Sequence, residues 1–141
     1  TYAKSTSMIY VVIDTNVFVS AYLTHNLESA TSKVVTNLMQ GRLTLLYNDE
    51  IIAEYKEVLS RPHLHISAAE REALFAYIQE NGVLAERTNF NELFVDEDDR
   101  VFYEVALSEE DSFLVTGNLK HYPIDPRVVT PAQMLQILEE E

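Results

Sequence analysis

Short runs of apolar residues alternate along the chain with longer segments in which apolar residues recur at helical spacing. The first run is "IYVVID" at Ile9–Asp14, and the others are "LTLLY" at Leu43–Tyr47, "GVLAER" at 82–87, "SFLVTGN" at 112–118 and "RVV" at 127–129. Continuous β-branched and aliphatic runs of this length are typical of strands buried on both faces of a parallel sheet. We therefore predict strands at these five places.

The segments between these runs predict helices, at about 16–23, 28–40, 49–60, 67–81, 98–108 and 130–140. Gly41 and Pro62 mark helix ends, because glycine is favoured just past a helix C-terminus and the residue before a proline avoids helical geometry. "SAAERE" from Ser67 matches a capping box. Thr130 and Pro131 place a cap and a proline where the last helix begins.

Strands separated by helices predict parallel βαβ units and hence an α/β fold, a three-layer α/β/α sandwich with a mostly parallel central sheet. A length of 141 residues suits one domain with a sizeable core. Residues 1–7, "TYAKSTS", carry no apolar period. We expect a tag remnant or a disordered tail there and a single domain over 8–141.

Composition and charge narrow the function. The chain has no cysteine, which excludes disulfides and thiolate metal sites and fits a cytoplasmic protein. No apolar run is long enough to span a bilayer. Acidic residues outnumber basic ones 23 to 10 and the net charge is −13, whereas nucleic-acid binders usually carry a basic face. Either the target is not a polyanion, or divalent cations neutralise the acids locally.

Polar side chains follow the first and fourth predicted strands directly. Asp14 and Asn16 come after "IYVVI", and Thr116 and Asn118 come after "FLV". Ligands of open α/β sheets bind outside the carboxyl ends of the strands, so both places are candidate sites. The alternatives are that Asp14 caps the next helix and that Gly-Asn forms a plain turn.

One acid of the third predicted helix, "NDEIIAEYKEVLS", lies near the buried edge of that helix. At about 100° per residue, Glu54 is roughly 100° from the centre of the apolar stripe, whereas Glu50 is roughly 140° and Glu57 roughly 160° away. Glu50 and Glu57 are expected to face solvent. Glu54 either points toward a site or reaches outward to water.

Four consecutive acids, Asp96, Glu97, Asp98 and Asp99, precede the fifth predicted helix. The helix dipole stabilises acids in a first turn, which is the simplest explanation of the run. Four acids exceed what capping requires, and their mutual repulsion is costly unless solvent or a cation relieves it. Hard cations such as Mg²⁺ and Mn²⁺ prefer oxygen ligands of this kind.

The motifs "VVIDTNVFVSAYL", "EIIAEYKEVLSRP", "DEDDRVFYEVAL" and "FLVTGNLKHYP", in this order over nearly all of 8–138, resemble the PIN-domain family. This family comprises metal-dependent ribonucleases, including many toxins of bacterial toxin–antitoxin pairs. The resemblance implies that Asp14, Glu54 and Asp99 bind Mg²⁺ or Mn²⁺, with Asp96 as a further candidate ligand. It implies that Asn16 and Thr116 support the site and that Ser20 lines it.

One position departs from the family pattern. Asn118 stands where relatives usually carry an acid, which removes one negative charge and is expected to lower metal affinity. Lys120, His121, Arg100 and Arg61 are the candidates for contacts with phosphate. A lone histidine is also commonly structural or solvated, which is the alternative for His121.

The leading hypothesis is an Mg²⁺- or Mn²⁺-dependent endoribonuclease that cleaves single-stranded RNA, the toxin of a toxin–antitoxin pair. Its expected partners are RNA, a small basic antitoxin and, as a homodimer, a second copy of the chain. The alternative is a weakened PIN-like module that binds a protein partner without cleaving RNA. A haloacid-dehalogenase-type phosphotransferase needs a second acid at Asn16, and a receiver domain needs acids before Asp14, so both are disfavoured.

Overall fold

A computed structural model of the protein describes residues 8–141, and these residues form a five-stranded sheet with the strand order β3-β2-β1-β4-β5. Every neighbouring pair of strands is parallel. The strands are β1 (Tyr10–Ile13), β2 (Thr44–Tyr47), β3 (Val83–Leu84), β4 (Ser112–Val115) and β5 (Val128–Val129). The predicted α/β fold is confirmed, with a sheet that is parallel throughout. The expected tag remnant or tail at 1–7 lies outside the described residues.

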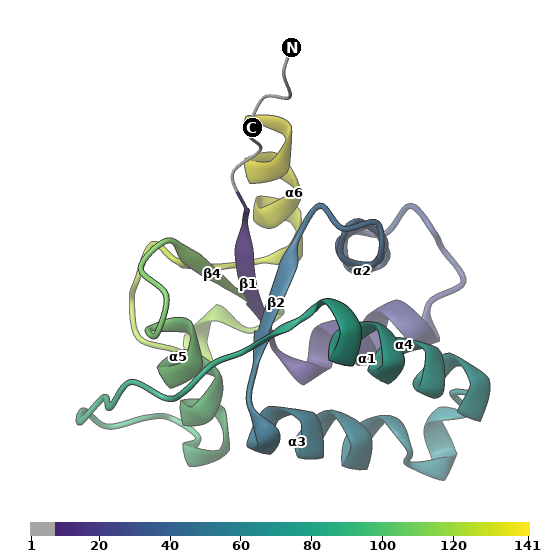
Figure 1. Ribbon diagram of the computed structural model, residues 1–141, viewed down its shortest axis with the longest axis horizontal. Coiled ribbons are helices and arrows are strands. Elements are labelled where there is room, and N and C mark those ends of the chain that lie inside the picture. Colours follow the sequence, from purple (N-terminus) through teal and green to yellow (C-terminus); the bar gives the residue numbers. More distant parts are fainter. Residues whose placement is uncertain (1–7) are drawn as a thin grey trace.

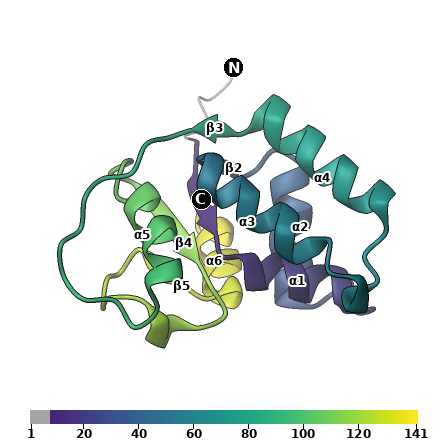
Figure 2. The same cartoon turned by 90° about the horizontal axis from the view of Figure 1, so that it is seen from below.

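Helices cover both faces of this sheet. They are α1 (Thr15–Leu23), α2 (Ala30–Met39), α3 (Asp49–Leu59), α4 (Ala68–Asn81), α5 (Arg100–Ala106) and α6 (Pro131–Glu139). Helix α5 packs on β1 and β4 on one face, and α1, α2 and α6 lie together on the other (Figures 1 and 2). Helix α3 passes below the carboxyl ends of the strands and contacts both α1 and α5 (Figure 1).

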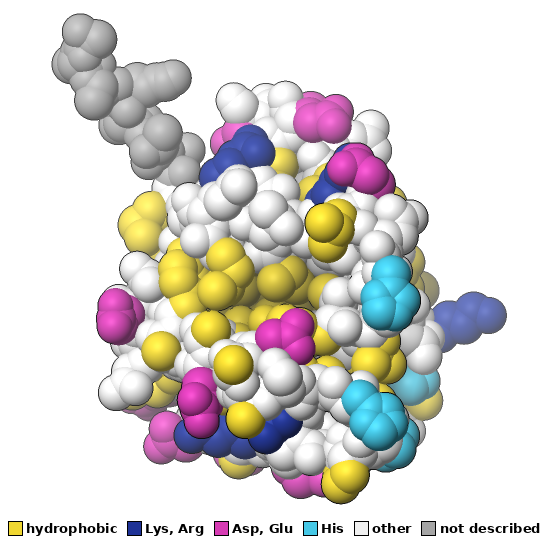
Figure 3. All heavy atoms as spheres, turned by 90° about the vertical axis from the view of Figure 1, so that its right-hand side faces the viewer, with side chains coloured by type: hydrophobic (Ala, Val, Ile, Leu, Met, Phe, Trp, Pro, Cys, Tyr) yellow, Lys and Arg dark blue, Asp and Glu magenta, His cyan; other side chains and the backbone are white. Residues whose placement is uncertain are grey.

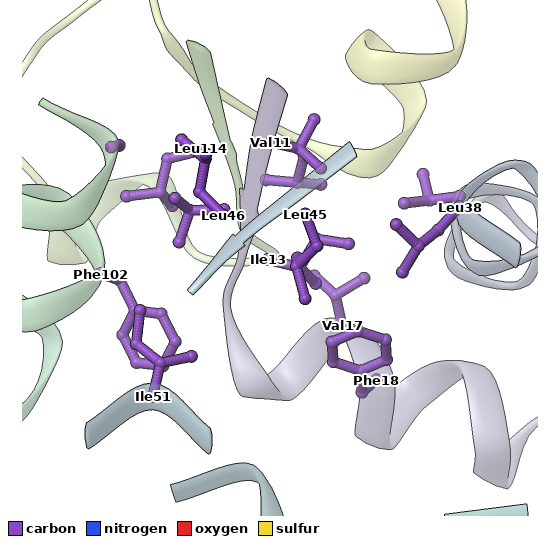
Figure 4. Close-up of a cluster of buried hydrophobic side chains, with 14 of the residues drawn as sticks. Val11, Ile13, Val17, Phe18, Leu38, Leu45, Leu46, Ile51, Phe102 and Leu114 are labelled. Atoms are coloured by element: carbon purple, nitrogen blue, oxygen red, sulfur yellow. The ribbon is translucent and has the colours of Figure 1, made fainter. Parts of the chain in front are cut away.

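The core explains why the apolar runs form strands. Leu45 and Leu46 are neighbours in β2, and their side chains enter opposite sides of the sheet, as strand geometry requires (Figure 4). Leu46 lies on the side of Phe102 from α5, whereas Leu45 lies on the side of Leu38 from α2 (Figure 4). Because both faces are covered, the strands read as continuous apolar runs instead of alternating ones.

The helix boundaries follow from local capping. Ser67 and Glu70 form the predicted capping box at the start of α4. Gly41 has a φ of 83°, a left-handed conformation that glycine adopts without strain after α2. Helix α2 begins at Ala30, later than the predicted 28, because the Ser29 side chain accepts a hydrogen bond from the Ser32 amide and caps it there.

The acidic run differs most from prediction. A continuous helix over 98–108 was expected, but α5 covers only Arg100–Ala106 and is preceded by the 3-10 turn η2 (Glu97–Asp99). The Asp96 side chain accepts a hydrogen bond from the Asp98 amide, which favours the tighter turn. Two further 3-10 turns, η1 (Pro62–Leu64) and η3 (Leu119–His121), follow the third helix and the fourth strand.

The strand order reverses beside β1, and this position defines where a ligand is expected. The chain leaves β1 for β2 on one side and later adds β4 on the other. The Asp14 amide donates to the Val115 carbonyl over 2.9 Å, so the ends of β1 and β4 are in contact. Ligands of open parallel sheets bind at such a reversal, outside the carboxyl ends of the strands.

The surface over α1, α2 and α4 has a hollow lined by hydrophobic side chains (Figure 3). In this view the lysine and arginine side chains are scattered and do not form a basic face. No helix among residues 8–141 is long and apolar enough to cross a membrane.

Candidate functional site

Asp14 is a buried carboxylate held by two hydroxyl groups. It follows β1 directly and is 5% exposed. Its Oδ2 accepts hydrogen bonds from the Thr116 Oγ1 and the Tyr122 hydroxyl, each over 2.9 Å. Asp14 occupies the N-cap position of α1, but its side chain makes no capping hydrogen bond. The carboxylate therefore belongs to the end of the sheet, and the capping alternative is wrong for the side chain.

The two donors to Asp14 come from the segment that follows β4. Thr116 is fully buried, and its Oγ1 also accepts a hydrogen bond from the Asn118 amide over 3.0 Å. Tyr122 is 6% exposed. Burial, and then the negative charge of Asp14, raise the pKa of Tyr122 far above its ordinary range. The phenol therefore stays protonated and serves as a donor.

Glu54 is the acid of α3 that reaches the site. It is half-buried, whereas Glu50 and Glu57 are exposed and pair with Arg87 and Arg61. The Thr15 hydroxyl donates a short hydrogen bond to Glu54 Oε2. Burial raises the pKa of Glu54, the Thr15 hydrogen bond opposes this rise, and the charge of Asp14 adds to it. The helical-wheel prediction for this helix is confirmed.

Asp99 is the inward-facing member of the acidic run. Its side chain is 15% exposed, whereas Asp96 and Asp98 are exposed. The His121 Nδ1 lies 3.1 Å from Asp99 Oδ2. Burial, and then the charge of Asp14, raise the pKa of Asp99 to about 6, although His121 lowers it in part. Asp96 instead caps the 3-10 turn, so its expected role as a metal ligand has no support from its position.

The three acids share one arrangement. Each has one carboxylate oxygen bonded to a protein donor, and the second oxygen makes no protein hydrogen bond within residues 8–141. An all-oxygen donor set with unrelieved negative charge fits a hard cation. No group of three or more His, Asp or Glu side chains among the described residues lies close enough to hold an ion by itself. The set therefore fits an ion held by one or two carboxylates, with water and a substrate phosphate as its other ligands.

A cleft of about 340 Å³ opens beside Asp14. Its lining includes three of the catalytic candidates but not Asp99, Thr116 or Asn118, and it consists of Asp14, Thr15, Asn16, Val19, Glu54, Val58, Arg61, His63 and Leu64. The Asn16 Oδ1 accepts a hydrogen bond from the Gly117 amide over 3.3 Å, which joins the start of α1 to the end of β4. Ser20, predicted to line the site, is exposed and lies outside the cleft lining, with its hydroxyl 3.2 Å from Thr31 Oγ1.

The remaining predicted residues differ in their surroundings. Asn118 is half-buried and begins the η3 turn. Lys120 is exposed, one residue before His121. Arg100 pairs with Glu97 over 2.7 Å and donates to the carbonyls of Phe90 and Glu92, so its guanidinium holds the preceding loop. Because the guanidinium is used in these bonds, its position gives no support to the predicted contact between Arg100 and a phosphate.

Sequence reasoning missed two hydroxyl donors, Thr15 and Tyr122. Thr15 follows Asp14 directly, and a hydroxyl beside a candidate acid was the available signal. Tyr122 follows His121 in "LKHYP", six residues past Thr116, and nothing local marks its phenol as a partner of Asp14. Their partners lie 39 and 108 positions away along the chain.

Comparison with known proteins agrees with this geometry. A family model described as PIN domain matches residues 10–120, a stretch that includes Asp14, Glu54, Asp99 and Asn118. A search of curated proteins finds no match. PIN domains are in general nucleases, and an acid at the carboxyl end of the first strand suits that chemistry. Because the match covers most of the chain and the parallel α/β fold agrees with it, the chain belongs to the PIN-domain family.

Proposed function

We propose that the protein is an endoribonuclease that cleaves single-stranded RNA with the help of Mg²⁺ or Mn²⁺. The observation that carries the proposal is Asp14, a buried carboxylate at the reversal of strand order whose charge contributes to the raised pKa values of the half-buried acids Glu54 and Asp99. Membership of a family of nucleases makes hydrolysis of a phosphodiester the reaction that this site suits best.

The residues of the site would have two roles, to bind the ion and to orient the acids that bind it. Asp14, together with Glu54 or Asp99, would hold the ion, since each offers a carboxylate oxygen without a protein partner. Thr15 and Thr116 donate hydrogen bonds to Glu54 and Asp14 and so limit the orientations of these two acids. A bound divalent ion supplies Lewis-acid stabilisation at phosphorus and activation of the attacking water.

Two basic side chains of the cleft favour a nucleic-acid strand as the substrate. Arg61 and His63 line the same cleft as Asp14 and Glu54, so the Arg61 guanidinium, which also pairs with Glu57, and the His63 ring lie within reach of a phosphate bound there. A single strand suits the site because its bases are accessible, whereas double-stranded RNA is read mainly by shape. With a net charge of −13, these few basic side chains matter more than they would in a basic protein.

The proposal includes a biological role. A protein of charge −13 suits a basic partner, and the toxin of a toxin–antitoxin pair acting in the cytoplasm, neutralised by a small basic antitoxin, fits that charge. A homodimer is proposed with it. Co-purification of the chain with the product of a neighbouring gene, and its mass in solution, test these two points.

Cleavage of a mixed-sequence single-stranded RNA with Mg²⁺, Mn²⁺ or EDTA, beside the Asp14→Asn variant, tests the activity. We expect cleavage with either ion, none with EDTA and none in the variant. Cleavage that persists in EDTA would exclude the metal-dependent reaction. Equal cleavage by Asp14→Asn would point to a contaminating nuclease and overturn the assignment.

A second candidate function is a PIN-domain module that binds a protein partner without cleaving RNA. Asn118 in place of the family's usual acid favours it, as does the lack of a closed group of three acids among residues 8–141. If the wild type is folded and inactive while Asn118→Asp cleaves RNA, this second function is the better one.

A further inference from the structure

His121 and Tyr122 are adjacent residues that contact two different acids of the site. The His121 ring nitrogen Nδ1 lies 3.1 Å from Asp99 Oδ2, and the Tyr122 hydroxyl donates to Asp14 Oδ2 over 2.9 Å. Both residues lie just past the stretch that the family comparison matches, which ends at residue 120. One short segment therefore contacts both the acid that follows β1 and the acid that precedes α5.

The contact between Tyr122 and Asp14 constrains the carboxylate closely. Oδ2 accepts from Thr116 and from Tyr122, so both of its favoured acceptor directions are used and Oδ1 is left for a ligand. Hydrogen bonds to an ionised acceptor are stronger than neutral ones, and burial strengthens them further. Phenylalanine would fill the same volume but leave Oδ2 with a single donor.

The packing behind Tyr122 holds its ring in place. The ring of Phe94 meets it edge-to-face, with centroids 6.0 Å apart and an interplanar angle of 89°. Phe94 in turn packs on Tyr103 and Phe90. An aromatic ring that is fixed on one side and bonded at its hydroxyl on the other has little freedom to let the carboxylate turn.

We propose that His121 and Tyr122 are a pair of positioning residues that hold Asp99 and Asp14, each by one oxygen, and so set the relative orientation of the two acids toward a bound ion. The proposal rests on the proposed function for its effect on cleavage, but its effect on ion binding does not require that RNA be the substrate. It also assigns His121 a different role from the phosphate contact expected from the sequence.

The chain offers a matched control for Tyr122 in Tyr103. The Tyr103 hydroxyl donates to Asp125 Oδ2 over 2.7 Å, and its ring packs on the same Phe94 at 5.8 Å. Tyr103→Phe and Tyr122→Phe therefore each remove one tyrosine–aspartate hydrogen bond from the same aromatic cluster. Only the second removes it from an acid of the site.

The experiment compares these variants in two measurements. Mn²⁺ affinity is measured without RNA by the electron paramagnetic resonance signal of the free ion, and kcat and KM are measured on a single-stranded RNA. In Tyr122→Phe we expect Mn²⁺ affinity and kcat to fall by about 10–100-fold, as for other residues that orient metal ligands, with little change in KM. Tyr103→Phe is expected to lose comparable thermal stability and to keep wild-type Mn²⁺ affinity and kcat.

His121→Ala tests the other member of the pair and does not depend on the folding of Tyr122→Phe. A positioning role predicts weaker Mn²⁺ binding and lower kcat, whereas a phosphate contact predicts a higher KM with Mn²⁺ affinity unchanged. Wild-type Mn²⁺ affinity in both Tyr122→Phe and His121→Ala would overturn the proposal, as would equal losses in Tyr103→Phe.

Failure of the proposed function is recognised separately. If the wild type binds Mn²⁺ but cleaves no RNA, the nuclease assignment fails and the Mn²⁺ comparison alone decides the role of the pair. If the wild type binds no Mn²⁺, there is no ion toward which the two acids are oriented, and the positioning role is overturned as well.

Discussion

Asp14 and the two acids around it are supported in different ways. Asp14 is buried, and one of its oxygens accepts from two hydroxyl groups. Glu54 and Asp99 are half-buried, have one side-chain donor each, and have pKa values raised first by burial. The inner acid is thus held by two side-chain hydroxyl groups, whereas each outer acid has a single side-chain partner for its charge.

This difference separates two tasks within one site. A carboxylate that is fixed by several donors presents a defined geometry, which is what a reacting centre requires. Carboxylates with raised pKa values gain most when a proton or a cation arrives, because the cost of their buried charge, and then the repulsion from Asp14, is relieved. Under the proposed function, the inner acid would set the direction of a bound cation and the outer acids would supply the attraction for it.

The largest expected effect tests the inner acid. Asp14→Asn should lower the single-turnover rate of RNA cleavage by more than about 100-fold, beyond the loss typical of a residue that only orients a ligand. The fold should persist, because the amide oxygen can still accept from Thr116 and Tyr122. Circular dichroism checks the fold, and a folded variant with more than a tenth of wild-type activity would contradict the central role of Asp14.

The next largest effect is expected at Asn118, where the family usually carries an acid. Asn118→Asp adds a negative charge at the end of β4 and should raise Mg²⁺ affinity by about tenfold, equivalent to about 1.4 kcal/mol. The same change should lower the thermal midpoint in EDTA, because it adds to the repulsion around Asp14. Asn81→Asp, at the exposed end of α4, is the control for added charge alone. A lower Mg²⁺ affinity in Asn118→Asp would show that the asparagine is the better ligand here.

Two of the three acids stand at places that the sequence itself marks, since Asp14 ends an apolar run and Glu54 lies at the edge of a helical stripe. Asp99 was singled out from the acidic run only by the resemblance to the PIN-domain family. All five strands also lie where apolar runs predict them. These are local signals, and the burial that produces the fold follows the same pattern of apolar positions.

What the sequence could not predict depends on contacts between distant segments. The bond from Tyr122 to Asp14 spans 108 positions, and no local pattern distinguishes this tyrosine from the other seven. The orientation of Asp96 and Asp99 was also hidden, because consecutive acids have no apolar period. The 3-10 turn at Glu97–Asp99 determines this orientation by turning the Asp99 side chain inward.

A smaller effect tests the outer acids through pH in the absence of metal. The pKa of Asp99 is about 6 in the folded protein against an ordinary value of 3.8. Between these values the folded state binds more protons than the unfolded state, so the free energy of unfolding falls as pH rises through this window. Asp99→Asn removes this loss of stability, so the variant should have a free energy of unfolding about 1 kcal/mol higher than wild type at pH 7. The gain is smaller than the full pKa shift implies, because the substitution also weakens the contact with His121.

Urea unfolding in EDTA at pH 4 and pH 7 measures this difference. The advantage of Asp99→Asn should be largest at pH 7 and should shrink toward pH 4, where the wild-type carboxyl is protonated in the folded state. Glu50→Gln is the control, because Glu50 is exposed and pairs with Arg87 outside the cleft lining. A variant that is less stable than wild type at both pH values would show that favourable contacts of Asp99 outweigh the cost of its buried charge.

The smallest expected effect tests whether the RNA passes Arg61 or Lys120. Arg61 lines the cleft beside Asp14 and Glu54, whereas Lys120 lies outside that lining on the η3 side. If the strand passes through the cleft, Arg61→Gln should raise KM a few-fold with kcat unchanged and reduce the salt dependence of binding by about 0.7 in log–log slope, the value for one phosphate contact on a single strand. Lys120→Gln should then have little effect. The reverse result would direct the RNA past His121 and Asp99, and Asp99, more than Glu54, would lie where the substrate enters.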